Sequence, residues 1–166
     1  MFFIASDSSP LISLASIERF SILEKHYDHI IIPPAVWTEI TDDIHRRPGC
    51  LELINARDSN FVKIIKPENF HLIQLLKNQL HEGEAEAIAL ALQEKAPILL
   101  IDEAEGREVA KSYNIPVIGV IGILAAAKKT GEIESMKTEL DSLIQRTSFR
   151  VSRIMYDKAL EMSGEL

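Results

Sequence analysis

The sequence predicts an α/β fold in which a mostly parallel central sheet lies between two layers of helices, a three-layer α/β/α arrangement. Short apolar runs alternate with amphipathic helical patterns along the chain, and this alternation is typical of a parallel sheet. Asp7 and Asp102 each close one of the apolar runs. Right-handed crossovers align the carboxyl ends of parallel strands, so we expect both aspartates at the same edge of the sheet, where ligands bind in such folds.

Length and composition indicate one domain over residues 1–166, with 46% hydrophobic and 26% charged residues. No segment approaches the roughly 20 apolar residues that span a bilayer, and no basic leader or cleavage site precedes the first apolar run. Cys50 is the one cysteine, which excludes an internal disulfide and favours a cytoplasmic location. The net charge of −7 argues against an open basic surface for nucleic acid. It does not exclude such a substrate, because metal ions bound by clustered acids would offset part of the charge.

The elements of the first half follow from local signals. Ser9 and Pro10 predict a helix start, with serine as the cap and proline at the first helical position, and apolar residues at helical spacing extend this helix to Leu23. Pro33 and Pro34 end a strand and open the helix that contains Glu39. Strands are expected at residues 2–6, 29–32 and 61–65, a further helix at 69–80, and a loop with a short helix over 41–60.

The second half repeats the alternation. Its strands are expected at residues 98–101 and 117–118, with a short edge strand at 149–151. Its helices are expected at residues 84–95, 104–113, 119–130, 134–146 and 154–162.

Helical phase separates the acids of the segment 82–86. At about 100° per residue, Glu84 lies on the same stripe as Ile88 and Ala91, which we expect to pack on the sheet. Glu82 and Glu86 fall on the opposite side and are expected to face solvent. The phase therefore favours Glu84 as the acid that points toward the edge of the sheet.

Glu39 adjoins Ile40 and follows Val36 by three residues, which indicates the inward side of its helix. A carboxylate beside core residues is unfavourable unless something compensates for its desolvation, and a hard cation such as Mg²⁺ or Mn²⁺ does so. Carboxylates of this kind that meet at a sheet edge predict a site for a divalent metal. The candidate residues are Asp7, Glu39, Glu84 and Asp102.

Each candidate also has a purely structural alternative. Asp7 could cap the first helix, and Asp102 could cap the helix after it, with Glu103 and Glu105 as acids of the first turn. The glutamates of residues 82–86 could complement the dipole of their own helix, and Glu39 could be a solvated surface residue.

The order and spacing of these acids resemble the PIN-domain family, and within it the VapC-like branch of prokaryotic proteins. The resemblance rests on the strand that ends in Asp7 before Ser8-Ser9-Pro10, on residues 30–40, on residues 83–91 and on residues 98–102. It extends over nearly the whole chain. The resemblance implies Mg²⁺- or Mn²⁺-dependent hydrolysis of RNA at an acidic catalytic and metal-binding site made of Asp7, Glu39, Glu84 and Asp102.

The resemblance also implies a homodimer and an antitoxin protein as partner, because many members are toxins. Many members carry an aromatic residue just after the last aspartate, whereas this chain has Glu103-Ala104-Glu105-Gly106. We therefore expect a metal-dependent endoribonuclease, with Glu105 or Glu86 as open further members of the site. The alternative is a catalytically weak or inactive PIN-like module that acts through protein or nucleic-acid binding.

Overall fold

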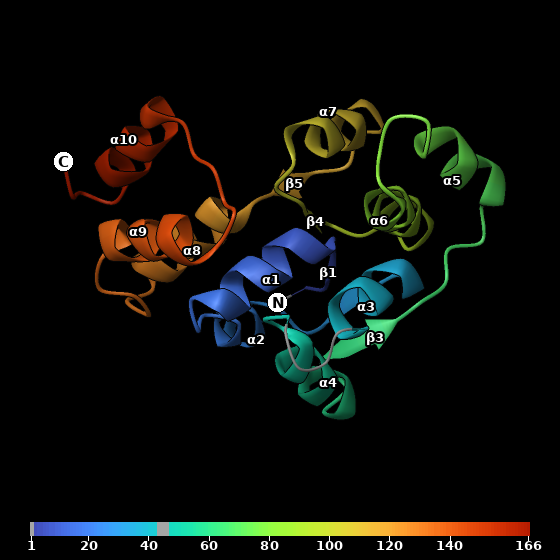
Figure 1. Cartoon of the computed structure of the whole chain (residues 1–166), viewed down its shortest axis with the longest axis horizontal. Coiled ribbons are helices and arrows are strands. Elements are labelled where there is room, and N and C mark those ends of the chain that lie inside the picture. The colour runs from blue at the N-terminus through green and yellow to red at the C-terminus, as the bar shows by residue number, and fades with distance from the viewer. Residues whose placement is uncertain (1, 43–46) are drawn as a thin grey trace.

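The computed structural model describes residues 2–42 and 47–166, which form five strands and ten helices (Figure 1). All pairings between neighbouring strands are parallel, and the strand order is β3-β2-β1-β4-β5. The α/β class with a parallel central sheet is therefore confirmed. The strands are β1 (Ile4–Ser6), β2 (Ile30–Ile32), β3 (Val62–Ile64), β4 (Leu99–Leu100) and β5 (Val117–Ile118).

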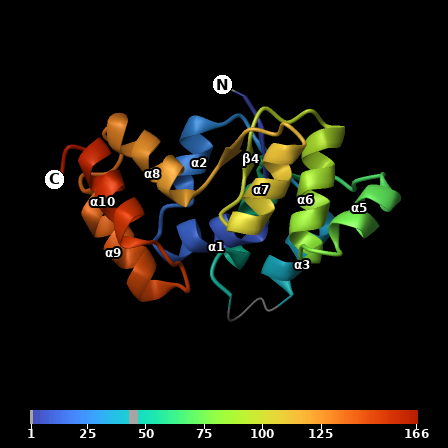
Figure 2. The ribbon, with the colours of Figure 1, turned by 90° about the horizontal axis from the view of Figure 1, so that it is seen from above.

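Both faces of the sheet are buried. Successive side chains of a strand point to opposite faces, so Ile30 and Ile32 join one core cluster and Ile31 joins the other. The first cluster includes residues of α1 (Ser8–Ser16), α2 (Ser21–His26), α3 (Pro34–Thr41), α4 (Cys50–Asp58), α8 (Val120–Lys129), α9 (Met136–Arg146) and α10 (Arg153–Met162). The second includes residues of α5 (Phe70–Leu76), α6 (Glu82–Gln93) and α7 (Ala104–Ser112). Figure 2 shows α8, α9 and α10 gathered at one end of the molecule and α5 and α6 at the other.

The prediction of a single helix from Ser9 to Leu23 is wrong in two respects. The helix begins earlier, with Asp7 in the N-cap position, so Pro10 is the third helical residue. It is also divided into α1 and α2, because Glu18 adopts a left-handed backbone conformation with φ of 60°. This bend lets both Ile17 and Phe20 bury their side chains in the same core cluster.

The expected edge strand over residues 149–151 is absent from the described structure. The hydroxyl of Thr147 accepts a hydrogen bond from the Phe149 amide at 2.9 Å, so a side chain satisfies a backbone donor that a strand would use. Helix α4 lies in the expected loop region, of which residues 43–46 fall outside the described residues. Helix α5 ends at Leu76, four residues before the expected end.

The two strand-end aspartates lie at one edge of the sheet, as the parallel arrangement requires. Strands β1 and β4 are neighbours, with Ser6 opposite Leu100. The Asp7 amide donates to the Leu100 carbonyl at 3.0 Å, and Asp102 follows β4 by two residues. None of the described helices is long and apolar enough to cross a membrane.

Candidate functional site

Three of the four candidate carboxylates line one cavity. Asp7, Glu39 and Glu84 face a hollow of about 490 Å³ at the carboxyl edge of the sheet. Asp102 lines an adjoining cavity of about 860 Å³, and Ser9 and Glu103 line both. We call the first hollow the acidic cavity and the second the side cavity. The structure therefore brings three of the candidate carboxylates into one cavity and places the fourth, Asp102, in the adjoining one.

Asp7 is the most deeply buried of these acids, with 2% of its surface exposed. It occupies the N-cap position of α1, but its side chain accepts no capping hydrogen bond. Burial raises its pKa from 3.8 to about 7, opposed by the Ser8 amide and reinforced by the charges of neighbouring carboxylates. Helix capping therefore does not explain why this aspartate is buried.

Asp102 caps a helix distant in sequence. Its Oδ1 accepts a hydrogen bond of 2.9 Å from the amide of Val120, the first residue of α8, whereas the N-cap residue of α7 is Glu103. The alternative that Asp102 caps the helix after it is therefore wrong. Its Oδ2 is buried without a hydrogen-bond partner among the described residues. Burial raises the pKa of Asp102 to about 6, although the Val120 amide and the Arg107 charge both lower it.

Glu84 is buried and held by the start of its own helix. Its Oε2 accepts a hydrogen bond of 3.1 Å from the amide of His81, the N-cap residue of α6. Burial raises the pKa of Glu84, and the His81 amide opposes this effect. Glu84 can therefore cap its own helix and also take part in the site, because the capping hydrogen bond uses only one of its two carboxylate oxygens.

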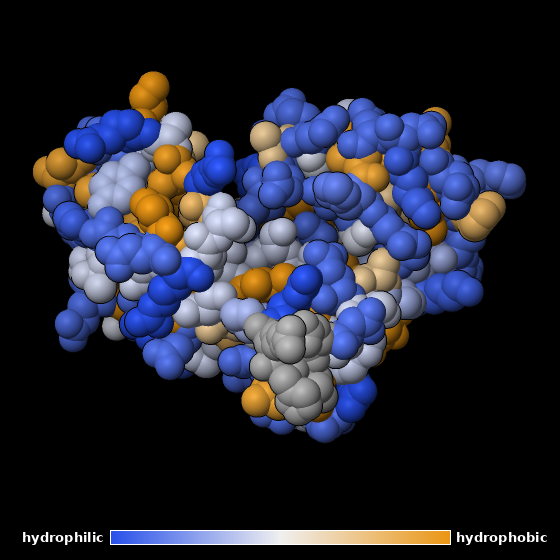
Figure 3. All heavy atoms as spheres, viewed as in Figure 1, coloured by the Kyte–Doolittle hydropathy of each residue, from blue (hydrophilic) through white to orange (hydrophobic). Residues whose placement is uncertain are grey.

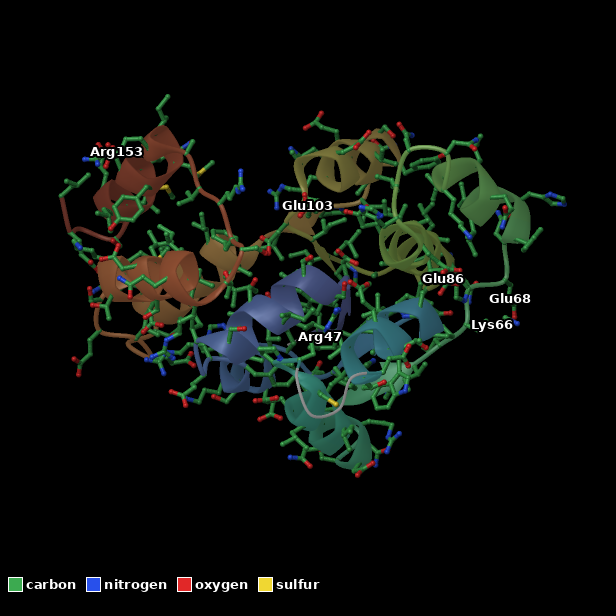
Figure 4. All side chains as sticks on the ribbon, viewed as in Figure 1. Arg47, Lys66, Glu68, Glu86, Glu103 and Arg153 are labelled. Atoms are coloured by element: carbon green, nitrogen blue, oxygen red, sulfur yellow. The ribbon has the colours of Figure 1, made fainter. Side chains whose placement is uncertain are left out.

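Glu86 faces solvent only in part, whereas its helical phase places it on the solvent side of α6. It lies between α6 and α3 (Figure 4), and its Oε2 accepts a hydrogen bond of 3.0 Å from the amide of Ala35 in the first turn of α3. The prediction is wrong in part, because α3 covers this side of α6. Glu82 is exposed and lies 3.6 Å from the Lys77 ammonium, as expected for a solvent-facing acid.

Glu39 stands at the mouth of the acidic cavity. Val36 and Ile40 are buried, but 45% of the Glu39 side chain is exposed, and its Oε1 lies 3.8 Å from the guanidinium of Arg47. The prediction that Glu39 points inward is therefore wrong, because its side chain is not buried. A Cβ on Gly83 would lie 3.1 Å from Glu39 Oε2 and 3.5 Å from Asp7 Oδ1, so the bare start of α6 leaves room for both carboxylates.

The donor set suits a hard cation that keeps much of its water. Within residues 2–42 and 47–166, no three His, Cys, Asp or Glu side chains stand close enough to hold a metal by themselves. Mg²⁺ usually keeps several waters and binds through one or two carboxylates plus substrate phosphates. The unpartnered Oδ2 of Asp102 and the buried carboxylate of Asp7 are hard oxygen donors of this kind. The residues present therefore fit such an ion.

Of the two residues that the sequence left open as further members of the site, Glu105 lines the acidic cavity and Glu86 does not. Glu103 and His81 also line it, although the sequence did not predict them as site residues. Glu103 directly follows Asp102, and His81 directly precedes the acidic segment 82–86, so adjacency in sequence was the available signal. It could not show which of these neighbours points inward.

The family model described as "DUF3368: PIN domain" matches residues 3–165, a span that includes all four candidate acids. Among solved structures, the chain is similar to a PilT N-terminus domain protein from the hyperthermophilic archaeon Sulfolobus solfataricus P2. The two are 18% identical with a TM-score of 0.48, over 76% of this chain and 93% of that one. No curated protein matches.

Proposed function

The chain belongs to the PIN-domain family, and on this premise we propose that it is an Mg²⁺- or Mn²⁺-dependent ribonuclease that hydrolyses phosphodiester bonds of RNA. PIN domains are generally metal-dependent nucleases. One observation carries the proposal for this chain: the buried carboxylate of Asp7 shares a cavity with Glu39 and Glu84 and adjoins Asp102. Burying several acids together is unfavourable without a cation, so their placement supports a metal-binding role.

We assign Asp7 and Asp102 as the primary metal ligands. When bound, one or two divalent ions would generate the nucleophilic hydroxide and stabilise the charge that grows on the phosphate and the leaving oxygen. The Val120 amide holds Asp102 through Oδ1 and leaves Oδ2 available. Asp7 must lose its proton before it can act as a ligand.

We propose that Glu39 and Glu84 act on water molecules in the outer part of the site. Glu39 is solvent-exposed at the mouth, so it can accept a proton from the attacking water and release it to solvent. Glu84 is fixed by the His81 amide and orients water from a set position.

A cleavage assay tests the nuclease proposal. Wild type, Asp7→Asn and Asp102→Asn are incubated with labelled RNA in Mg²⁺ or Mn²⁺. Glu108→Gln is the matched control, since Glu108 is an exposed acid of α7 that pairs with Lys111. We expect both asparagine variants to lose activity about 100-fold or more and the control to keep it. Cleavage that survives EDTA, or that both asparagine variants retain, contradicts the proposal. Cutting of a circular RNA establishes endonucleolytic action, because a circle has no ends.

We further propose that the protein is a VapC-like toxin that works in the cytoplasm as a homodimer and is inhibited by an antitoxin. The resemblance of residues 30–40 and 83–91 to that branch supports this narrower proposal. Expression in a bacterial host is expected to stop growth, and Asp7→Asn is expected to restore it. Light scattering measures the dimer, and a short reading frame directly upstream would supply the antitoxin. Normal growth with wild-type protein present would argue against a toxin.

The absence of an aromatic residue in Glu103-Ala104-Glu105-Gly106 favours a second candidate function, a PIN-like module that binds without cutting. Such a module is stabilised by the metal yet cleaves no RNA. Thermal unfolding with and without Mg²⁺, measured beside the cleavage assay, separates the two functions.

A further inference from the structure

The side cavity adjoins the acidic cavity at Asp102. It has a volume of about 860 Å³ and lies between β5, the starts of α7 and α8, and the segment that leads into α10. Figure 3 shows a notch between the surface over α10 and the surface over α7. Ser9 and Glu103 line both cavities, and Glu103 stands at the start of α7 (Figure 4). The two cavities therefore adjoin one another, and we call the pair the groove.

Among the described residues, the side cavity, unlike the acidic cavity, has arginines as well as acids in its lining, since Asp102 and Glu103 also contribute to it. Two arginines, Arg107 and Arg150, contribute to it. The guanidinium of Arg107 donates to the Ile101 carbonyl at 2.9 Å and is thereby held in place. Arg150 is exposed, and no carboxylate of the described residues lies within 4.0 Å of its guanidinium. This wall can therefore receive an anion.

The rest of the lining mixes polar groups, mostly serines, with apolar side chains. Phe149 and Ile121 pack in part against the core, and both line the cavity together with Met155. On the floor, a Cβ on Gly119 would lie 2.6 Å from Asp102 Oδ1, and one on Gly122 would lie 2.6 Å from the Ile118 side chain. The two glycines are thus closely packed, and an aromatic ring lies in the same cavity as the arginines.

We propose that the side cavity binds a single RNA strand and holds the nucleotides on one side of the phosphate that reaches the acids. The proposal rests on the nuclease function above. Arginine suits phosphate because its planar guanidinium donates two parallel hydrogen bonds. The face of an aromatic ring stacks on an unpaired base, whereas a duplex keeps its base faces stacked inside. Arg150 and Arg107 contact phosphates, and Phe149 stacks on a base.

The two arginines also explain how an acidic protein can retain RNA. With a net charge of −7, the surface as a whole repels a polyanion. Positive charge beside Asp102 offsets that repulsion where we propose that the strand lies. The arginines belong to the side cavity alone, whereas none of the described residues that line the acidic cavity is an arginine.

Binding experiments in the Asp7→Asn background, with Mg²⁺ present, test the proposal without cleavage. Fluorescence anisotropy measures the affinity for a short labelled single-stranded RNA and for a duplex of the same sequence. The variants are Arg150→Ala and Phe149→Leu, of which the second keeps apolar bulk and removes the ring. Arg153→Ala is the control, because Arg153 pairs with Asp157 at 3.0 Å and lies on the outer side of α10 (Figure 4).

We expect Arg150→Ala to weaken single-strand binding about tenfold and to reduce the salt slope by about 0.7. Phe149→Leu is expected to weaken single-strand binding about tenfold while leaving duplex binding unchanged, and Arg153→Ala to change neither. In the cleavage assay with Asp7 intact, Arg150→Ala is expected to raise KM and leave kcat nearly unchanged, as loss of uniform binding does.

The outcomes separate this proposal from the nuclease proposal. If both side-cavity variants bind as tightly as the Arg153→Ala control, the groove is not the RNA site, even where the wild-type protein cuts RNA. Equal loss of single-strand and duplex affinity in Phe149→Leu also overturns it. If the wild-type protein never cuts RNA but both variants lose single-strand affinity, the nuclease proposal fails and the RNA groove stands.

Discussion

Replacing Asp7 by asparagine should stabilise the metal-free protein above neutral pH, even as it removes the proposed metal ligand. Asp7 has a pKa near 3.8 in an unfolded chain and about 7 in the folded one, chiefly because it is buried. Between these values the folded state binds the extra proton, so the free energy of unfolding decreases as pH rises. Above pH 7 the full unfavourable contribution of the buried charge is present. Asparagine has a similar shape and does not ionise.

The size of the effect follows from the two pKa values. Each pKa unit corresponds to about 1.4 kcal/mol, so ionisation of Asp7 lowers the free energy of unfolding by about 4 kcal/mol between about pH 4 and pH 8. Asp102 and Glu84, whose pKa values are also raised, stay in the variant and add their own decrease. The difference between the wild-type and Asp7→Asn profiles therefore reports the ionisation of Asp7 together with its coupling to these neighbours.

Urea unfolding in EDTA at a series of pH values measures this difference. We expect Asp7→Asn to gain stability over wild type as pH rises, and Glu108→Gln to follow the wild-type profile because Glu108 is exposed. Mg²⁺ at about 100 times its Kd should then add about 2.7 kcal/mol to wild type and little to Asp7→Asn. A difference between wild type and Asp7→Asn that is the same at pH 5 and pH 8 would refute the reasoning.

Three further substitutions have defined outcomes. Gly83→Ala places a Cβ 3.1 Å from Glu39 Oε2, so we expect weaker Mg²⁺-induced thermal stabilisation while the stability of the metal-free protein changes by less than about 1 kcal/mol. Gly119→Ala places a Cβ 2.6 Å from Asp102 Oδ1, so RNA cleavage should decrease at least about tenfold and urea unfolding should show a less stable protein. Glu165 accepts hydrogen bonds from two amides at the start of α9, and although burial opposes it, these contacts lower its pKa to about 2. Glu165→Gln should therefore lower the free energy of unfolding at pH 7 by about 1 kcal/mol. In wild type the same contribution should be lost as pH decreases from about 4.5 toward 2, and an unchanged acid transition in the variant would contradict this.

Local signals predicted the layers and most of the elements. Strands and amphipathic helices are recognised by the spacing of apolar residues within each segment, and this spacing can be read directly from the sequence. The joint position of Asp7 and Asp102 follows from parallel pairing of β1 and β4. The break at Glu18 was not predicted, because it arises from the need to bury Ile17 and Phe20 together.

The sequence could predict candidate residues for the site, but not how their side chains are arranged in space. Helical phase places a side chain relative to its own axis, but it does not say which other element packs there. Glu86 faces α3 and is only partly exposed to solvent, and Glu39 lies exposed at the mouth of the acidic cavity although its neighbours are core residues. Both outcomes depend on contacts between separate helices.

The sequence by itself therefore determined the fold class and placed two aspartates at one edge of a parallel sheet, since both follow from short-range periodicity and the handedness of crossovers. Only the tertiary structure decided that Asp102 caps α8 and that Arg150 and Phe149 come to lie beside it. These contacts join segments far apart in the chain, and packing of α8, α9 and α10 against one another, and of α8 and α9 against α1, creates them.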